Sequence, residues 1–341
     1  MPAKPCKDKY NIIQLYRIIN KREELMKIVF TDSKIIKQVH MDTNDFKKLG
    51  EVTSYDFTPL EDINKRIKDA NAIITNKTPL NKETLKDAKN LKYIGVIATG
   101  YDNVDINYCK ENGITVTNAG EYSTDAVCQH TFAFILECVC RIRDYTKFVK
   151  DGRWKDRNEF TPFVFDTYEL QNMTLGIIGY GHIGKAVAKV ANAFNMNVLV
   201  NTRTISNDNS VTFTDLDTLL KESDIVTVHC PLNTNTNKLF NKNTFVKMKD
   251  GAIFINNARG GIVDENDLVD ALNSHKLSYA CLDVLNEEPM SINSKLCEVD
   301  NLLITPHAAW APLETRKRLM DITYNNLKNF IDGNPTNVVS K

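Results

Sequence analysis

The sequence predicts an α/β protein with two parallel-sheet domains, Rossmann-like or flavodoxin-like, and an active-site cleft between them. Three observations support this prediction. Short apolar runs alternate with polar, helix-forming stretches along most of the chain, which is typical of parallel sheets covered by helices. One such unit, 174–203, carries a glycine-rich turn between a strand and a helix. The length of 341 residues suits about two domains better than one core.

The glycine-rich turn is the most specific local pattern in the chain. An apolar run of strand type, 174–178, leads directly into it, and apolar residues recur at helical spacing after it. Gly179 would form the turn, Gly181 would let a pyrophosphate approach, and Gly184 would let the helix pack on the strand. The pyrophosphate would rest on the helix N-terminus, whose free N–H groups favour an anion. The expected coenzyme contacts in this turn are Gly179, Tyr180, Gly181, His182, Ile183 and Gly184.

The end of the following strand indicates which dinucleotide fits. In NAD-binding units a carboxylate there holds the ribose 2′-hydroxyl. Here the strand 198–200 runs into Asn201, Thr202 and Arg203, and no acid precedes Asp208. Thr202 and Arg203 instead offer a hydroxyl and a guanidinium that could bind a 2′-phosphate; the alternative is that Arg203 stacks on the adenine ring. We therefore expect NAD or NADP as the coenzyme, with NADP(H) slightly favoured.

Composition argues against several classes of partner. Lys plus Arg equals Asp plus Glu at 43 each, so no net charge attracts nucleic acid or an anionic membrane. No apolar run approaches the ~20 residues that span a bilayer, and the N-terminus has no apolar core of signal-peptide type. The eight cysteines lack the paired spacing of a zinc site or a disulfide framework. We expect a cytoplasmic protein that binds a small molecule and no metal, nucleic acid or membrane.

The first half of the chain supplies two candidate binding loops. Residues 1–25 are polar and mildly basic and are expected to be an N-terminal extension without catalytic work. Four strand-like runs then follow, and the loops after the second and third lie where ligands gather in open α/β sheets. Gly100 would let backbone N–H groups approach a small anion, although a simple turn with an Asp cap is the alternative. The runs are 28–30, 72–75, 93–98 and 114–117, and the loops contain Lys77, Thr99, Gly100 and Tyr101.

The second half repeats the α/β alternation around a long helix. This helix is expected to start near Ser123 and to end at 150–152. Because parallel strands deliver their carboxyl ends to one edge, the polar residues that follow each later strand should gather there. A last helical pattern, 313–331, is expected to cross back onto the first domain. The predicted domains are 26–123 with 311–341 for the substrate, and 124–310 for the dinucleotide.

Read together, these stretches resemble the D-isomer-specific 2-hydroxyacid dehydrogenases, and within them the glycerate dehydrogenase/hydroxypyruvate reductase branch. The resemblance covers nearly all of 26–335, and several ordered motifs are far more specific than any one. The pair Gln129-His130 and the later Trp310 point to the branch. The motifs are a substrate loop at 99–105, a hinge helix at 122–130, the glycine loop at 174–184, and segments at 256–261, 282–289 and 305–311.

The resemblance implies a role for each polar residue at the expected edge. Reduction of a 2-oxo acid needs a hydride, a proton for the carbonyl oxygen and a cation for the carboxylate. Arg259 would bind the carboxylate, His307 would exchange the proton, and Glu288 would orient the imidazole and favour its protonated form. The implied substrate contacts are Lys77, Thr99, Gly100, Tyr101 and Trp310. Further implied coenzyme contacts are Thr202, Arg203, Cys230, Pro231, Asn257, Ala258 and, on the nicotinamide side, Asp283.

The implied activity is NAD(P)H-dependent reduction of a small 2-oxo acid to the D-2-hydroxy acid by a homodimer. Hydroxypyruvate or glyoxylate would be converted to D-glycerate or glycolate. One alternative is another D-2-hydroxyacid dehydrogenase, of the D-lactate or phosphoglycerate type. The other is a non-catalytic protein that senses dinucleotides, like the corepressors that share this fold, because a fold does not determine a function.

Overall fold

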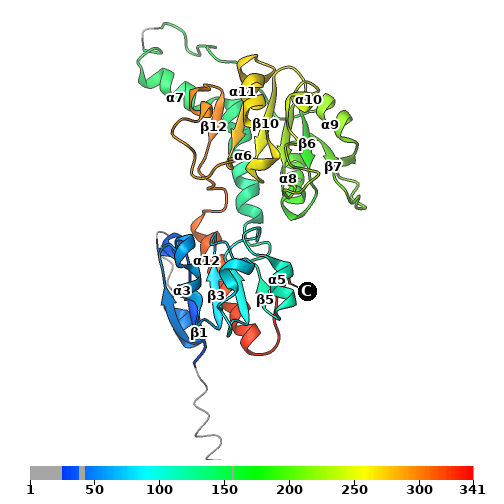
Figure 1. The fold of residues 1–341 in the computed structure, drawn as a ribbon. Coiled ribbons are helices and arrows are strands. Elements are labelled where there is room, and N and C mark those ends of the chain that lie inside the picture. Colours follow the sequence, from blue (N-terminus) through cyan, green and yellow to red (C-terminus); the bar gives the residue numbers. More distant parts are fainter. Residues whose placement is uncertain (1–24, 38–42, 156, 341) are drawn as a thin grey trace, which may run out of the picture. The chain divides into compact units, whose positions relative to one another are not determined.

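The computed structural model describes residues 25–37, 43–155 and 157–340, which form two compact units (Figure 1). One unit contains the residues up to Tyr122 together with those from Leu313 onward, and the other is Ser123–Pro312. The chain therefore passes between the units twice. Apart from Leu25, the expected N-terminal extension lies outside the described residues.

In the first unit the described residues form a five-stranded, wholly parallel sheet in the order β2-β1-β3-β4-β5. Strands β3 and β4 are buried along their whole length, as expected for parallel strands covered on both faces. The strands are β1 (Lys27–Phe30), β2 (Glu51–Ser54), β3 (Ala72–Thr75), β4 (Tyr93–Val96) and β5 (Thr115–Thr117). The helices are α2 (Lys34–Lys37), α3 (Ile63–Ile67), α4 (Lys82–Leu85), α5 (Ile106–Glu111) and α12 (Leu313–Ile331), with 3-10 turns η1 (Asn44–Lys48) and η2 (Leu60–Asp62).

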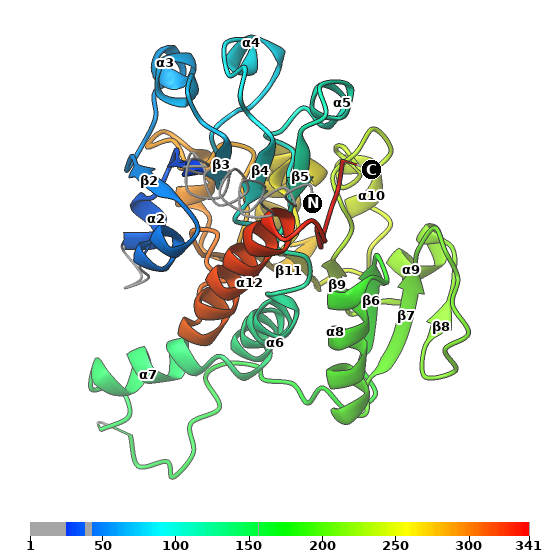
Figure 2. The same cartoon turned by 90° about the horizontal axis from the view of Figure 1, so that it is seen from below.

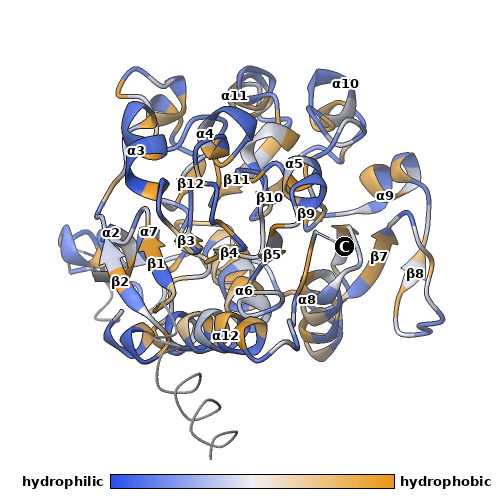
Figure 3. Ribbon diagram, turned by 60° about the horizontal axis from the view of Figure 1, so that its bottom comes forward, coloured by the Kyte–Doolittle hydropathy of each residue, from blue (hydrophilic) through white to orange (hydrophobic). Residues whose placement is uncertain are grey.

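Helix α12 packs on this sheet although it comes from the end of the chain. Its Phe330 ring lies 4.9 Å from the ring of Tyr93 on β4, and Leu319 and Leu327 are buried on the same helix. Figure 3 shows the helix in both orange and blue, as expected for one apolar and one polar face. Beyond the helix, Val338 forms an antiparallel bridge with Thr117 at the edge of the sheet.

In the second unit the described strands form a seven-stranded parallel sheet in the order β12-β11-β10-β9-β6-β7-β8. The order reverses between β6 and β9, which is the switch point where doubly wound folds bind ligands. The strands are β6 (Thr174–Ile178), β7 (Asn197–Asn201), β8 (Thr212–Phe213), β9 (Ile225–Val228), β10 (Ala252–Asn256), β11 (Leu277–Leu282) and β12 (Leu302–Ile304). The helices are α6 (Thr124–Cys140), α7 (Ile142–Lys150), α8 (His182–Ala193), α9 (Leu216–Glu222), α10 (Lys242–Phe245) and α11 (Glu265–Asn273), with 3-10 turns η3 (Gly260–Ile262) and η4 (Lys295–Glu298).

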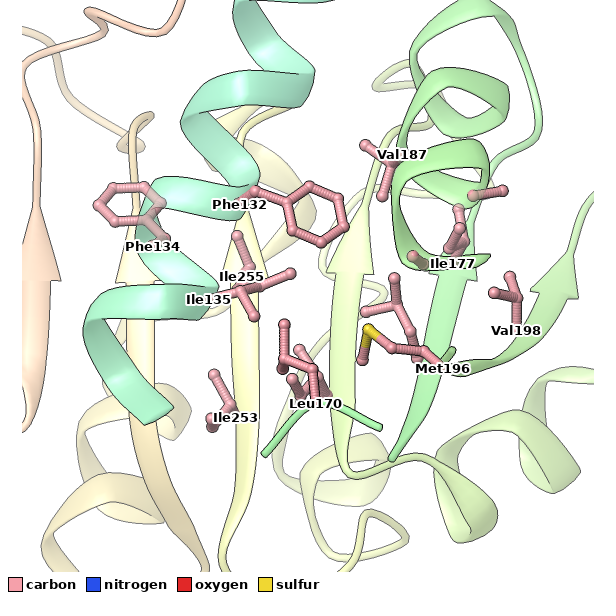
Figure 4. Close-up of a cluster of buried hydrophobic side chains, with 14 of the residues drawn as sticks. Phe132, Phe134, Ile135, Leu170, Ile177, Val187, Met196, Val198, Ile253 and Ile255 are labelled. Carbon is pink, nitrogen blue, oxygen red and sulfur yellow. The ribbon is translucent and has the colours of Figure 1, made fainter. Parts of the chain in front are cut away.

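Two apolar clusters cover the two faces of this second sheet. On one face, side chains of α6 and α8 meet the strands, with Phe132, Ile135 and Val187 among them (Figure 4). Along β10, Ile253 and Ile255 join this cluster while Phe254 joins the other, because successive strand residues point to opposite faces. Among the described residues, no helix is both long enough and apolar enough to cross a membrane.

The structure confirms the prediction of two parallel-sheet α/β domains, with two differences in detail. Strands β2 and β8 were not predicted, because both are short and partly exposed edge strands without an apolar run. The prediction of one continuous helix from Ser123 to residue 150 was wrong. Arg141 has a left-handed backbone, with φ 53°, so α6 ends at Cys140 and α7 starts at Ile142.

Candidate active site

One row of paired residues brings most of the expected site of the second unit to a single edge of the sheet. The row crosses six strands, and every pair in it is parallel. It consists of Asn201, Ile178, Val228, Asn256, Leu282 and Ile304. The next residue of each strand therefore leaves the sheet at the same carboxyl edge. These next residues are Thr202, Gly179, His229, Asn257, Asp283 and Thr305.

The glycine turn at this edge has the backbone geometry that the sequence predicts. Gly179 has φ 94°, and a Cβ atom there would lie 2.7 Å from the carbonyl oxygen of His229. A Cβ atom at Gly184 would overlap the carbonyl oxygen of Gly179, so the helix approaches the turn closely. At Gly181, the N-cap of α8, a Cβ atom would meet none of the described atoms within 4 Å. The open position fits a pyrophosphate, and contact with it stays a prediction.

The end of β9 supplies half-buried groups that do not titrate near neutral pH. Burial lowers the pKa of His229 to about 3, and its Nε2 lies 3.0 Å from the hydroxyl of Thr227. Burial also raises the pKa of the Cys230 thiol to about 11. Thr236 donates a hydrogen bond to the carbonyl of Pro231 at 2.7 Å. His229 therefore belongs to the packing of the edge, and Cys230 and Pro231 stay predicted coenzyme contacts.

Arg259 follows β10 in an extended conformation, with φ −146° and ψ 139°. The Asn256 side chain fixes this turn, because its amide donates to the Arg259 carbonyl at 2.9 Å and its Oδ1 accepts from Ala258 N at 3.0 Å. Asn257 is buried and donates to the hydroxyl of Thr131 on α6 at 2.9 Å. The Arg259 guanidinium donates to the Ala258 carbonyl at 2.8 Å. Its planar fork of donors is the group that best matches a carboxylate.

The segment after β10 is packed backbone to backbone against the loop that carries Glu288. A side chain at Gly260 would overlap the carbonyl group of Leu285, so only glycine permits this approach. The Asn286 backbone N–H also donates to Glu265 at 2.7 Å, at the start of α11. These contacts fix the two loops relative to each other within the unit.

His307 and Glu288 form a hydrogen-bonded pair. His307 Nδ1 lies 2.7 Å from Glu288 Oε2, and Glu288 Oε1 accepts from the Leu285 backbone N–H at 3.0 Å. The two side chains are 30% and 35% exposed, so both remain accessible. A carboxylate on Nδ1 fixes the orientation of the imidazole and leaves Nε2 as the atom that can exchange a proton.

The Asp283 carboxylate organises the loop in which His307 lies. Its side chain is 1% exposed, and it accepts hydrogen bonds from Thr305 Oγ1 at 2.5 Å, Ala308 N at 2.7 Å and Ala309 N at 3.0 Å. His307 N donates to the Asp283 carbonyl at 2.8 Å. His307 has φ 54°, a left-handed conformation that non-glycine residues rarely adopt. The carboxylate thus has a structural role, and the implied contact of Asp283 with the nicotinamide stays a prediction.

His130 extends this network from α6. Its Nε2 lies 2.9 Å from Thr305 Oγ1, which in turn donates to Asp283. Burial lowers the pKa of His130, against the opposing influence of Asp283, so the neutral ring is favoured. A neutral imidazole with its proton on Nε2 satisfies this arrangement, because Thr305 then accepts one hydrogen bond and donates the other. In the sequence, the pair Gln129-His130 indicates only the branch of the family and predicts no contact of this kind.

In the first unit, the expected substrate residues lie at the carboxyl ends of β3 and β4. Lys77 follows β3, while Thr99, Gly100 and Tyr101 follow β4. Thr99 Oγ1 donates to the Gly120 carbonyl at 2.5 Å, and Tyr101 is 37% exposed. Trp310, the remaining expected substrate contact, is half-buried and belongs to the second unit.

Asp32 is a residue of this edge that the sequence analysis missed. It follows β1, and the strand order of the first unit reverses between β1 and β3. The Asp32 carboxylate accepts backbone N–H groups from Asn76 at 2.8 Å, from Lys77 and from Thr78 at 3.0 Å. The loop after β3 is therefore an anion-binding turn that an internal carboxylate fills and holds in shape. The only signal in the sequence is an acid two residues after a strand.

The chain is similar to enzymes of one family along nearly its whole length. The family model described as "D-isomer specific 2-hydroxyacid dehydrogenase, NAD binding domain" matches residues 132–309. A hydroxypyruvate reductase of Blautia hydrogenotrophica is 42% identical over 93% of this chain and 100% of its own. A glycerate dehydrogenase of Methylorubrum extorquens is 38% identical over 92% and 98% of the two chains. A glyoxylate reductase of Thermococcus litoralis is 37% identical over 81% and 86%.

Two solved structures with bound nicotinamide coenzymes share the fold. An acyclic imino acid reductase in complex with NADPH and D-Arg superposes with a TM-score of 0.82 and 29% identity, over 92% of this chain and 100% of that one. A D-lactate dehydrogenase of Aquifex aeolicus, complexed with NAD and lactic acid, has a TM-score of 0.79 and 30% identity, over 92% and 99%. The fold thus accommodates either coenzyme.

Replacing Asp283 with Asn should lower stability and catalysis together. An amide cannot accept hydrogen bonds at both of its atoms, so a buried N–H group of the His307 loop loses its acceptor, at a cost of about 1–3 kcal/mol. We expect a lower urea midpoint and a lower kcat at saturating coenzyme. Asp215→Asn is the matched control: its carboxylate caps α9 through Thr218 N at 2.9 Å, so stability should fall slightly and kcat should not. A destabilised Asp283→Asn enzyme with full kcat would contradict the role in positioning His307.

Proposed function

This chain belongs to the D-isomer specific 2-hydroxyacid dehydrogenases, and we propose that it reduces hydroxypyruvate and glyoxylate to D-glycerate and glycolate. It is an oxidoreductase that uses a nicotinamide coenzyme. The relatives named hydroxypyruvate reductase and glycerate dehydrogenase match it over almost their whole length, which supports this substrate class. The single observation that carries the chemistry is the pair of His307 and Glu288, 2.7 Å apart, at the end of the sheet where the glycine turn also lies.

The proposed roles follow from the chemistry of the side chains. The dihydronicotinamide, when bound, supplies the hydride. Arg259 binds the substrate carboxylate through two parallel hydrogen bonds and orients the ketone. His307 donates the proton from Nε2 to the carbonyl oxygen, and Glu288 stabilises the imidazolium through Nδ1. Lys77, Thr99, Gly100, Tyr101 and Trp310 are the proposed substrate contacts.

Two alternatives have less support. A D-lactate or phosphoglycerate specificity uses the same chemistry, but the hydroxypyruvate reductase and the glycerate dehydrogenase are matched over 100% and 98% of their own length, against 50% for a D-3-phosphoglycerate dehydrogenase. A non-catalytic dinucleotide sensor does not need an accessible pair of His307 and Glu288. A substrate panel with both coenzymes tests all three: hydroxypyruvate and glyoxylate should give the highest kcat/KM, pyruvate or phosphohydroxypyruvate would indicate the other dehydrogenases, and tight coenzyme binding without turnover would support the sensor.

Replacing His307 with Gln should lower kcat about 100-fold or more, the scale of positioned acid catalysis, while coenzyme binding changes little. His275→Gln is a matched control, because His275 is an exposed histidine with a similar left-handed backbone, φ 57° against 54°. Steady-state rates with hydroxypyruvate and fluorescence titration of the coenzyme give the two readouts. An unimpaired His307→Gln enzyme would remove His307 from the mechanism.

We also propose that NADP(H) is the preferred coenzyme. Thr202 leaves the sheet beside Gly179, and the next residue, Arg203, is exposed. Within the part of the chain that the structure describes, the Arg203 side chain makes no hydrogen bond or ion pair. A guanidinium in this position fits a 2′-phosphate.

Arg203→Ala should raise the KM for NADPH about tenfold or more and leave the KM for NADH within twofold. Loss of a hydrogen bond to a charged group costs about 1.5–3 kcal/mol, and about 1.4 kcal/mol corresponds to a factor of ten. Steady-state kinetics with each coenzyme measure the difference. Lys221→Ala, at an exposed cation on α9 in the same unit, is the control. Equal losses with both coenzymes would instead indicate stacking on the adenine.

We propose that the protein is a homodimer. The proposed interface is the segment after α7 that contains Phe160, Phe163 and Phe165. Phe165 anchors this segment to α7, because Tyr145 donates to its carbonyl at 3.1 Å and the two rings lie 5.0 Å apart. Phe160 and Phe163 are nevertheless 94% and 90% exposed. Figure 2 shows the segment looping out from the sheet of its own unit. Exposed aromatic groups on an anchored segment are typical of an association surface.

Replacing Phe160 and Phe163 together with Ser should shift the protein from dimer to monomer. The change removes apolar surface from the proposed interface and leaves Phe165 in place. Light scattering coupled to size-exclusion chromatography measures the mass, and circular dichroism reports the fold. A variant that stays dimeric would place the interface elsewhere, and a monomeric wild-type protein would reject the dimer.

A further inference from the structure

The loop after β7 is closed onto the glycine turn at both of its ends. At its start, Gly179 N donates to the carbonyl oxygen of Asn201 at 2.8 Å. At its end, Tyr180 Oη donates to Asp208 Oδ2 at 2.7 Å. Residues 202–207 therefore leave the sheet beside one residue of the turn and return to the next. The proposed 2′-phosphate contacts Thr202 and Arg203 lie inside this closed loop.

Tyr180 is a rigid donor in this contact. Its side chain is buried, at 8% exposure, and its ring meets the Phe213 ring edge-on at 5.4 Å. Burial and the neighbouring Asp208 raise the pKa of Tyr180 to about 12, so the hydroxyl keeps its proton at neutral pH. The hydroxyl can therefore donate throughout the working range of pH.

Asp208 is the only acid between Asn201 and Thr214, and hydrogen bonds hold both of its carboxylate oxygens. Its Oδ1 accepts from Ser210 N at 3.0 Å and from Ser210 Oγ at 2.6 Å. The hydrogen bonds from Ser210 and Tyr180 lower the pKa of Asp208 to about 2, so the group is an anion. A carboxylate that moved next to a bound 2′-phosphate would repel it, because like charges at short range disfavour binding.

Cationic and polar groups remain to face a ligand at this loop. Lys185, on the first turn of α8, lies with its Nζ 5.9 Å from the centre of the Tyr180 ring. Arg203 is exposed on the loop itself. Within the described part of the chain, the buried Ser206 hydroxyl has no hydrogen-bond partner, so the loop also holds a polar atom that a bound group can satisfy.

We propose that the hydrogen bond from Tyr180 to Asp208 is a specificity clasp for the coenzyme. It closes the loop 202–207 on the glycine turn and holds the only acid of the loop on Tyr180, so that Arg203 and Lys185 face the 2′-phosphate of NADP(H). Tyr180 and Asp208 are thus specificity-determining residues and not catalytic ones. The inference rests on the proposed binding of NADP(H) and not on which 2-oxo acid is reduced.

The test is a fluorescence titration of NADPH and NADH binding, which needs no turnover. Tyr180→Phe keeps the ring and its packing on Phe213 but removes the donor, so the Kd for NADPH should rise at least fivefold while the Kd for NADH changes less than twofold. Adding Asp208→Asn to this variant removes the carboxylate charge that Tyr180 no longer holds and should restore the NADPH affinity to within about twofold of the wild type. Phe213→Leu, which changes only the packing under Tyr180, should alter both coenzymes equally.

The outcomes separate the clasp from the proposed function. Equal weakening of both coenzymes by Tyr180→Phe, or no rescue by Asp208→Asn, would overturn the clasp. A wild-type enzyme that binds NADH as tightly as NADPH would reject the proposed preference, while the change in the ratio of the two Kd values on Tyr180→Phe would still test the clasp. Failure to reduce hydroxypyruvate would reject the proposed substrate and leave the binding result unaffected.

Discussion

The parallel register of the seven-stranded sheet is the constraint on which the candidate site depends. One row of pairs, from Asn201 to Ile304, ends six strands at the same level. The residues that follow, from Gly179 to Thr305, are far apart in the chain but leave the sheet at one edge. A slip of one residue in any of these strands would turn its side chains to the opposite face. The apolar clusters on both faces of the sheet therefore fix the register, and with it the positions of the residues at the edge.

Hydrogen bonds and close backbone contacts then determine the exact positions of His307 and Glu288 at this edge. The left-handed backbone of His307 costs about 1–3 kcal/mol, and the hydrogen bonds that the Asp283 carboxylate and carbonyl accept offset this strain. Burial of a carboxylate is itself unfavourable unless the group is hydrogen-bonded, so Asp283 and the loop stabilise each other. The close approach at Gly260 holds the Glu288 loop on the segment of Arg259. Contacts within the unit thus hold both His307 and Glu288 in place.

Sequence reasoning predicted the features that repeat along the chain and missed those that depend on single contacts. Apolar runs and the glycine turn predicted both sheets, whereas the edge strands β2 and β8 have too few buried residues to produce a pattern. Helical periodicity continued through Arg141, so it could not reveal the break there. The pair of His307 and Glu288, 19 residues apart, came from family resemblance, because spacing alone does not bring them together. The partners of Asp32, Asp208 and Asp283 were not predicted, since long-range hydrogen bonds leave no periodic signal.

The closed loop between Asn201 and Asp208 can change in sequence independently of the strands beside it. Its ends are fixed on adjacent residues of the glycine turn, so its length and composition can vary without moving the strands that carry Arg259 and His307. Extra residues in a closed surface loop destabilise the fold little, since doubling the length costs only about 0.6 kcal/mol in closure entropy. The loop can therefore differ in sequence while the residues at the ends of the other strands keep their places.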